Sequence, residues 1–143
     1  MGKQLYYEDV QAGTELPPLR KHPTPRQLVM WAGASGDYYE IHYDKDFASN
    51  NGLTGIIVHG RLKVSFLMQM LTDWIGVDGA LYKFNVQHRG MDYPGEDLLC
   101  KGRVSNKYVK DGRHYVECEV WTENPRGERT APGTAVVILP AHG

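Results

Sequence analysis

One segment limits the possible folds of this chain more than any other: GRLKVSFLMQMLTDWIG, residues 60–76. Its polar side chains recur at helical spacing and form one narrow stripe, made by Arg61, Ser65, Gln69, Thr72 and Asp73. Apolar side chains cover most of the remaining circumference, and Lys63 is the exception. A helix that is apolar on most sides is a buried helix. The segment therefore predicts a central helix over about 60–75, ended by Gly76, with Met68 in the core.

After this helix the period of the apolar pattern changes to two. Alternating residues predict strands near 81–88, 100–105 and 115–121, and GTAVVILP predicts a closing strand over 133–140. The turn sequences DYPGED, KDGR and ENPRGE separate these strands. Four successive strands joined by short turns predict an antiparallel meander.

A curved antiparallel sheet wrapped around one apolar helix buries the apolar surface of both. This arrangement is the hotdog fold, of class α+β. The length of 143 residues fits a single domain over 1–143.

Upstream of the central helix the elements are shorter. Pro17 and Pro18 are tolerated at a sheet edge, so we expect an edge strand near 14–21. Thr24 and Pro25 predict a helix start, and Gly33 and Gly36 are expected to stop that helix. We expect residues 37–58 to be irregular.

Composition excludes several classes of function. The chain is 41% hydrophobic and 23% charged with a net charge of -1, which is typical of a soluble globular protein. The chain has no dense Lys/Arg run, so we expect no nucleic-acid partner. No apolar run is long enough to span a membrane. The first residues lack an apolar signal-peptide core, and Cys100 and Cys118 form no paired motif. We therefore expect a cytoplasmic protein with reduced thiols.

The stretch SGDYYEIHYDKDFA, residues 35–48, raises a question about chemistry. Asp37 and His42 lie five positions apart among tyrosines. Spacing alone is compatible with a solvated turn or with an acid/base pair. Metal ligands are also available, namely Asp37, His42, Asp44, Asp46 and His59, but no His-x-His or His-x-x-x-His spacing supports a metal site, and we expect none. The chain has no Gly-x-Ser-x-Gly motif of a serine hydrolase.

Two blocks together resemble the signature of the MaoC-like (R)-specific enoyl-CoA hydratases and 3-hydroxyacyl thioester dehydratases. The first block comprises Ser35, Gly36, Asp37, Ile41, His42 and Ala48. The second is IIVHG, residues 56–60, an aliphatic run with His-Gly at the head of the central helix. Residues 88–104 resemble the strand–turn–strand of the same family. The chain departs from the pattern at Tyr39-Glu40, where the family has Asn-Pro, and at Met68, where it often has serine.

The resemblance implies reversible syn hydration of a trans-2-enoyl thioester to a (3R)-3-hydroxyacyl thioester. Asp37 and His42 are then the acid/base pair that activates water, and the Gly60 N–H stabilises the enolate oxygen from the helix start. The implied substrate-binding residues are Tyr39, Ile57, His59, Ser65 and Met68, of which His59 is also expected to cap the helix and Ser65 to substitute for the family serine.

The resemblance also sets expectations about partners. The substrate brings its own CoA or acyl-carrier protein, so no cofactor is needed, and Arg61, Lys63 and Arg89 are candidates to meet the CoA phosphates. Related domains pair their sheets edge to edge, which implies a homodimer or a higher homo-oligomer. Two alternatives stay open: a hotdog acyl-CoA thioesterase, and a subunit of a heteromeric MaoC-like dehydratase.

Overall fold

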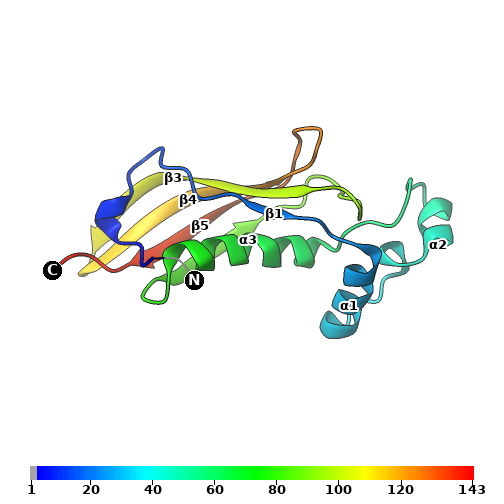
Figure 1. Ribbon diagram of the computed structural model, residues 1–143, viewed down its shortest axis with the longest axis horizontal. Coiled ribbons are helices and arrows are strands. Elements are labelled where there is room, and N and C mark those ends of the chain that lie inside the picture. Colours follow the sequence, from blue (N-terminus) through cyan, green and yellow to red (C-terminus); the bar gives the residue numbers. More distant parts are fainter. Residues whose placement is uncertain (1–2) are drawn as a thin grey trace.

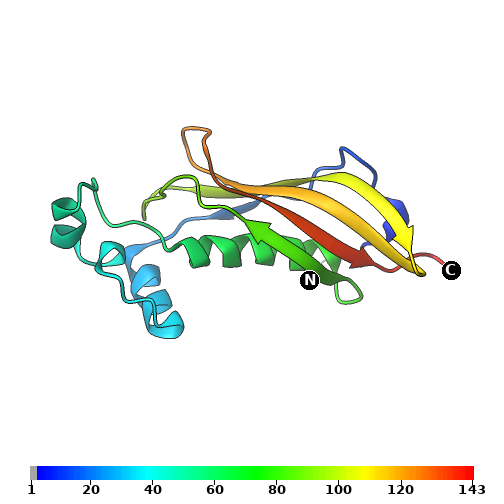
Figure 2. The ribbon, with the colours of Figure 1, turned by 180° about the vertical axis from the view of Figure 1, so that it is seen from behind.

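A curved antiparallel sheet packs against one long helix, α3 (Gly60–Ile75), in the computed structural model, which describes residues 3–143 (Figure 1). The sheet order is β1-β3-β4-β5-β2. The strands are β1 (Leu19–Lys21), β2 (Ala80–Val86), β3 (Leu98–Lys110), β4 (Arg113–Glu123) and β5 (Arg129–Leu139). Seen from behind, α3 again runs along one face of the sheet (Figure 2). The predicted hotdog architecture is confirmed.

The central helix has the predicted bounds, because its apolar faces are buried and Gly76 ends it with a φ of 75°. Leu67 and Leu71 are fully buried against the sheet. Met68, expected in the core, is 40% exposed. The reason is helical spacing: Met68 follows Ser65 by three residues and precedes Thr72 by four, so it shares their exposed stripe.

The predicted meander is correct only for β3, β4 and β5. Strand β2 pairs with β5, not with β3. DYPGED does contain the predicted turn, in which Glu96 N donates to Tyr93 O, but this turn is part of a crossover, residues 87–97, which passes from the edge strand β2 to β3, beside the opposite edge strand β1. The crossover first follows β5, through the bond from Arg89 N to Thr130 O, and later meets Pro23 through Gly95 N.

The predicted edge strand is also shorter than expected. Regular pairing with β3 is limited to β1, and an isolated bridge joins Glu15 to Arg103. Prolines 17 and 18 lie between the two, and their missing N–H groups interrupt the ladder.

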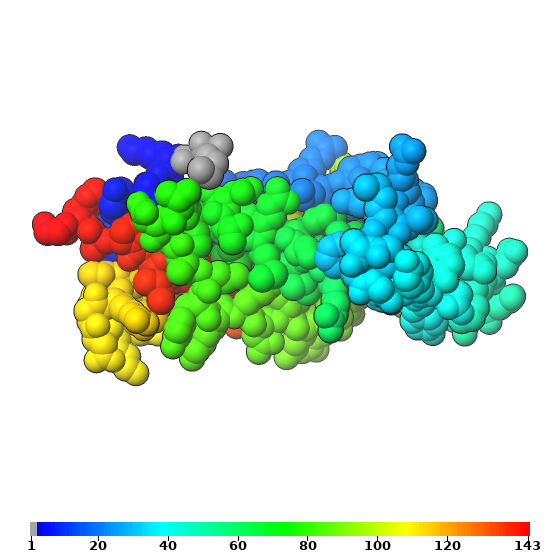
Figure 3. Space-filling model, turned by 90° about the horizontal axis from the view of Figure 1, so that it is seen from below, coloured from blue at the N-terminus to red at the C-terminus, as the bar shows by residue number. Residues whose placement is uncertain are grey.

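Residues 24–57 extend beyond the end of the sheet and are called the overhang below; Figure 3 shows them as a cyan lobe at one end of the molecule. They contain α1 (Pro25–Ser35), the 3-10 helix η2 (Glu40–His42) and α2 (Lys45–Asn50). The Thr24 side chain caps α1, as predicted, by accepting a hydrogen bond from Gln27 N. Gly33 does not stop this helix, because a glycine within a helix costs only about 1 kcal/mol.

Gly36 does end α1, with a left-handed φ of 78°. The expectation that residues 37–58 are irregular is wrong for η2 and α2. Asp44 caps α2 by accepting a hydrogen bond from Phe47 N, a local signal that the sequence analysis overlooked. No helix in residues 3–143 combines the length and the apolar character that crossing a membrane requires.

Candidate active site

The fold brings together the acid and the histidine that the sequence placed five positions apart. The left-handed turn at Gly36 releases Asp37 from α1, and η2 ends with His42. Asp37 Oδ2 lies 3.8 Å from His42 Nε2. This distance is longer than a direct hydrogen bond, so both atoms remain able to bind one water molecule. The carboxylate is 40% exposed and the imidazole is buried, so Asp37 is the member of the pair that solvent reaches.

One hydrogen bond fixes the proton on the His42 ring. Nδ1 of His42 lies 2.8 Å from the carbonyl oxygen of Ile57. Because a carbonyl oxygen only accepts, Nδ1 carries the hydrogen, and the lone pair of the neutral ring is on Nε2. The unprotonated nitrogen is therefore the one that faces Asp37. Ile57, expected to line the pocket, contributes its backbone carbonyl in this contact.

His59 lies directly behind His42. The two rings stack with centroids 3.8 Å apart and planes 20° from parallel. His59 is fully buried, and its Nε2 is 3.3 Å from the backbone oxygen of Asp37. Burial, followed by the nearby His42, lowers the pKa of His59 below its ordinary value, so the ring is neutral at pH 7. His59 occupies the N-cap position of α3, as expected, but its side chain makes no capping bond: the ring contacts His42 and Asp37 instead.

Asp37, His42 and His59 could also be considered as metal ligands, because one donor atom from each lies within 4.8 Å of the others. However, nearly parallel stacked rings direct their nitrogen lone pairs side by side, whereas a tetrahedral ion needs them to converge. The geometry therefore favours an acid/base pair over a metal centre.

Gly60 is the first residue of α3, where the N–H groups of a helix lack internal partners. Within residues 3–143 no acceptor is bonded to its N–H. The structure also gives a reason for glycine that the sequence did not: a Cβ here would lie 2.8 Å from His88 Cε1. His88 thus rests on the helix start. Desolvation, then the charge of Lys63, lowers the pKa of His88 below its usual value.

The remaining predicted pocket residues are less closely grouped. Tyr39 is half exposed and meets the His42 ring edge-on at a centroid distance of 6.2 Å, so it borders the pair. The Ser65 hydroxyl donates to Arg61 O within α3. Met68 lies almost a turn further along the helix and is exposed. Neither Ser65 nor Met68 makes a recorded contact with the acid/base pair in the described part of the chain.

Lys63 was a candidate to meet the CoA phosphates, but this expectation is wrong. The side chain is 2% exposed and forms an ion pair with Asp92 at 3.0 Å. Arg61 and Arg89 are exposed and keep that candidate role. One feature of the sequence hints at this pairing: a lysine on an otherwise apolar helix face.

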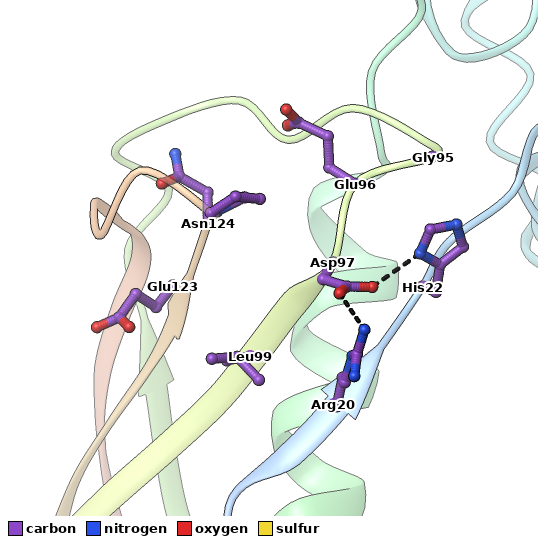
Figure 4. Close-up of a pocket in the computed structure, with 9 residues that line it drawn as sticks. Arg20, His22, Gly95, Glu96, Asp97, Leu99, Glu123 and Asn124 are labelled. Carbon is purple, nitrogen blue, oxygen red and sulfur yellow. Dashed lines mark hydrogen bonds and ion pairs between the residues drawn. The ribbon is translucent and has the colours of Figure 1, made fainter.

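A hollow of about 700 Å³ lies near the same end of the sheet (Figure 4). Asp97 is paired there with Arg20 and His22, and hydrogen bonds from His22 and Arg20 hold its pKa below the usual range. A second hollow, of about 570 Å³, is bordered by Ile56 and Tyr93. Neither hollow includes Asp37, His42 or Gly60. The acid/base pair lies outside these two hollows, at the boundary between the overhang and the rest of the fold, with the Asp37 side chain 40% exposed.

Solved structures share this fold. An unliganded R-hydratase from Pseudomonas aeruginosa aligns with a TM-score of 0.86 at 21% identity, covering 97% of this chain and 88% of that one. The (R)-hydratase of A. caviae involved in PHA biosynthesis aligns with a TM-score of 0.83 at 20% identity, covering 93% and 99%. The ChsH1–ChsH2 complex of Mycobacterium tuberculosis aligns with a TM-score of 0.79 at 23% identity, covering 90% and 98%.

The sequence comparisons point to the same group. The chain is 27% identical over 143 residues to an (R)-specific enoyl-CoA hydratase of Rhodospirillum rubrum, covering 96% of this chain and 94% of the relative. It is 26% identical over 100 residues to the beta subunit of a 3-oxo-4,17-pregnadiene-20-carboxyl-CoA hydratase of Mycobacterium tuberculosis, covering 70% and 76%. Residues 9–124 match the MaoC-like domain. The chain therefore belongs to the MaoC-like domain family, as its two sequence blocks predicted.

Proposed function

We propose that this protein is a lyase that reversibly adds water to a trans-2-enoyl thioester, giving a (3R)-3-hydroxyacyl thioester. The observation that carries the proposal is the hydrogen bond between His42 Nδ1 and Ile57 O, which leaves Nε2 to face Asp37 at 3.8 Å as the basic nitrogen. A fixed imidazole with its basic nitrogen beside a carboxylate is suited to activating one water. The hydratase names of the relatives support the same reaction class.

In this mechanism Asp37 and His42 hold the attacking water. His42 Nε2 accepts one proton as the water oxygen adds to the β-carbon. The pair, with Asp37 as the partner acid, returns one proton to the α-carbon on the same face, so that the addition is syn. General acid/base help of this kind contributes about 10²- to 10⁴-fold in rate.

The Gly60 N–H is assigned the role of stabilising the negative charge that develops on the thioester oxygen. The thioester oxygen becomes negative as the enolate forms, and a backbone N–H at a helix start is a preorganised donor. The Gly60 N–H fits this role because it begins α3 and bonds no acceptor within residues 3–143. Losing such a donor typically costs about 3 to 4 kcal/mol in the transition state.

We expect the protein to act as an oligomer. Strand β2 pairs with β5 on one side, and its other edge carries unpaired backbone groups in the described structure. Such an edge is a template for pairing with another chain, so a homodimer joined at β2 is the first candidate. The likeness to a beta subunit favours a second candidate, a hydratase assembled from two different chains. Free, buried cysteines suit a cytoplasmic location.

The test is the loss of enoyl-thioester ultraviolet absorbance when the purified protein meets short, medium and bulky trans-2-enoyl-CoAs. We expect a 3R product by chiral analysis and a fall in kcat of at least about 100-fold in both Asp37→Asn and His42→Ala. Asp46→Asn and His114→Ala are matched controls that should stay active. Release of free thiol without hydration indicates a thioesterase, and inactivity of the folded protein on every substrate contradicts a stand-alone hydratase.

A further inference from the structure

A buried ion pair lies beneath the first turn of α3 and has no part in the reaction described above. Lys63 and Asp92 are 2% and 3% exposed, and Lys63 Nζ is 3.0 Å from Asp92 Oδ2. Lys63 also donates to Gly90 O at 3.1 Å. The lysine comes from the central helix and the other two residues from the crossover, so the pair fastens the crossover to the helix.

The carboxylate of Asp92 is held from a second side as well. Thr130 on β5 donates to Asp92 Oδ2 at 2.5 Å, and Thr122 on β4 bonds Thr130 at 2.8 Å. Removing two charges from water is costly, and apolar side chains of similar volume often give equal or greater stability at such places. Stability alone therefore does not account for the pair, and a role in fixing one arrangement of the backbone is the alternative.

The backbone of Asp92 leads directly to the catalytic histidine. Its carbonyl oxygen accepts a hydrogen bond from Val58 N at 2.8 Å. The adjacent residue, Ile57, presents the carbonyl that fixes the tautomer of His42, and its own N–H donates to Ile41 O. Residues 57–58 are thus held between Ile41 and His42 on one side and Asp92 of the crossover on the other, and two hydrogen bonds, Val58 N to Asp92 O and His42 Nδ1 to Ile57 O, join the backbone of Asp92 to the His42 ring.

The same crossover also touches the proposed oxyanion donor. The His88 ring rests on Gly60, close enough that a Cβ there would be 2.8 Å from Cε1. Lys63, bonded to Gly90 O, is three residues from Gly60 on the helix. Residues 88–92 therefore contact the surroundings of both proposed catalytic groups, the His42 ring and the Gly60 N–H.

We propose that Lys63 and Asp92 are positioning residues, which hold residues 57–58 and the start of α3 so that His42 keeps its Nδ1–H tautomer. This inference rests on the hydratase function proposed above, but its structural part can be tested without activity. The ion pair touches neither water nor substrate: it acts through the bond from Val58 to Asp92 and the bond from His42 to Ile57.

The experiment compares the full-length protein with Lys63→Met/Asp92→Asn, which keeps both side-chain volumes and removes both charges. Thr130→Val is the milder variant, because it removes only one donor to Asp92. Arg103→Met is the control: it breaks an exposed ion pair with Glu119, which keeps Arg129 as a partner. Circular dichroism and thermal unfolding establish that each variant is folded.

The decisive readout is the ¹⁵N chemical shifts of the His42 ring, assigned with His42→Ala. We expect one Nδ1–H tautomer in the parent and in Arg103→Met, and a mixture of tautomers in the double variant. With trans-2-enoyl-CoA, kcat should fall by up to about 100-fold, the scale of a misplaced catalytic group, while KM changes little. Thr130→Val should change the tautomer mixture and kcat in the same direction as the double variant, but to a smaller extent.

Two results overturn the proposal. One is a folded double variant with the parental His42 tautomer, whatever its kcat. The other is a changed tautomer with kcat within about twofold of the parent, since the pair then does not matter for the reaction. If the double variant does not fold, Thr130→Val decides by the same criteria. A parent protein that hydrates no enoyl-CoA contradicts the proposed function, and the tautomer measurement still decides the structural part.

Discussion

The overhang and the remainder of the fold are built in different ways. Nearly all of the buried apolar side chains belong to the sheet, to α3 and to the segments beside them, whereas the overhang before residue 57 buries only Leu28, Ala32 and Ala48 among its apolar residues. The overhang instead exposes Val29, Met30, Tyr38, Tyr39 and Tyr43. Its shape depends on caps and on single hydrogen bonds, such as that from Ile57 N to Ile41 O. Two of the three proposed catalytic groups thus lie on the part with the smaller core.

The largest expected effects separate these two parts. Leu67→Ala removes a fully buried side chain from α3 and should lower the free energy of unfolding by about 2 to 5 kcal/mol. Its folded fraction should keep most of its hydratase activity. Asp37→Asn should do the opposite, with a large loss of kcat and a change in stability within about 0.5 kcal/mol, because Asp37 is partly exposed. Urea denaturation and enoyl-CoA kinetics measure both. If each variant lost stability and kcat to a similar extent, the separation of a stabilising core from a catalytic overhang would be contradicted.

A double-mutant cycle tests the boundary between the two parts. Gly60→Ala places a Cβ against the His88 ring and should cost about 1 to 3 kcal/mol through overpacking. In the His88→Ala background the same substitution should cost much less, since the ring that it meets is gone. Thermal unfolding of the four proteins gives the coupling energy. Additive effects would indicate that the ring moves freely and does not rest on Gly60.

The smallest expected effect is a dependence of stability on pH. The pKa of His59 is lower in the folded protein than in the unfolded chain, where it is near 6.5. The unfolded chain therefore binds more protons below that pH, and the contribution of His59 to stability, complete above about pH 6.5, is lost as the pH falls toward the folded pKa.

One proton limits this slope to about 1.4 kcal/mol per pH unit. Urea titrations between pH 7.5 and 5.5 should show a shallower decline in His59→Asn than in the parent, after allowance for the lowered pKa of His88. Parallel declines in the two proteins would exclude His59 as the acid-sensitive group.

The sequence predicted those features of the structure that depend on residues close together in the chain. The helix over 60–75 followed from its apolar circumference, and the start of α1 from Thr24 and Pro25. The closeness of Asp37 to His42 follows from a short segment, in which a left-handed glycine and one turn of 3-10 helix bring the two side chains together. Such features depend on neighbours within a few residues, so the sequence displays them.

Contacts between distant segments could not be predicted in this way. Nothing near Lys63 in the sequence indicates that Asp92 will neutralise it, and the alternation in 81–88 does not say which strand will be its neighbour. The choice of β5 over β3 as the partner of β2 depends on how the crossover passes the helix. The position of His88 on Gly60 follows from that same path and had no signal of its own.

The crossover also has a consequence for the order of folding. The β3–β4 and β4–β5 hairpins close short loops, whereas β1 must find β3 by pairing Leu19 with Cys100, and β2 must find β5 by pairing Ala80 with Ile138. Loop-closure entropy favours the nearer partners first. We therefore expect β3, β4 and β5, the centre of the sheet, to pair before the edge strands β1 and β2 during folding. The crossover takes its final path only once β2 lies beside β5. During refolding, the recovery of catalysis should lag behind the recovery of sheet structure.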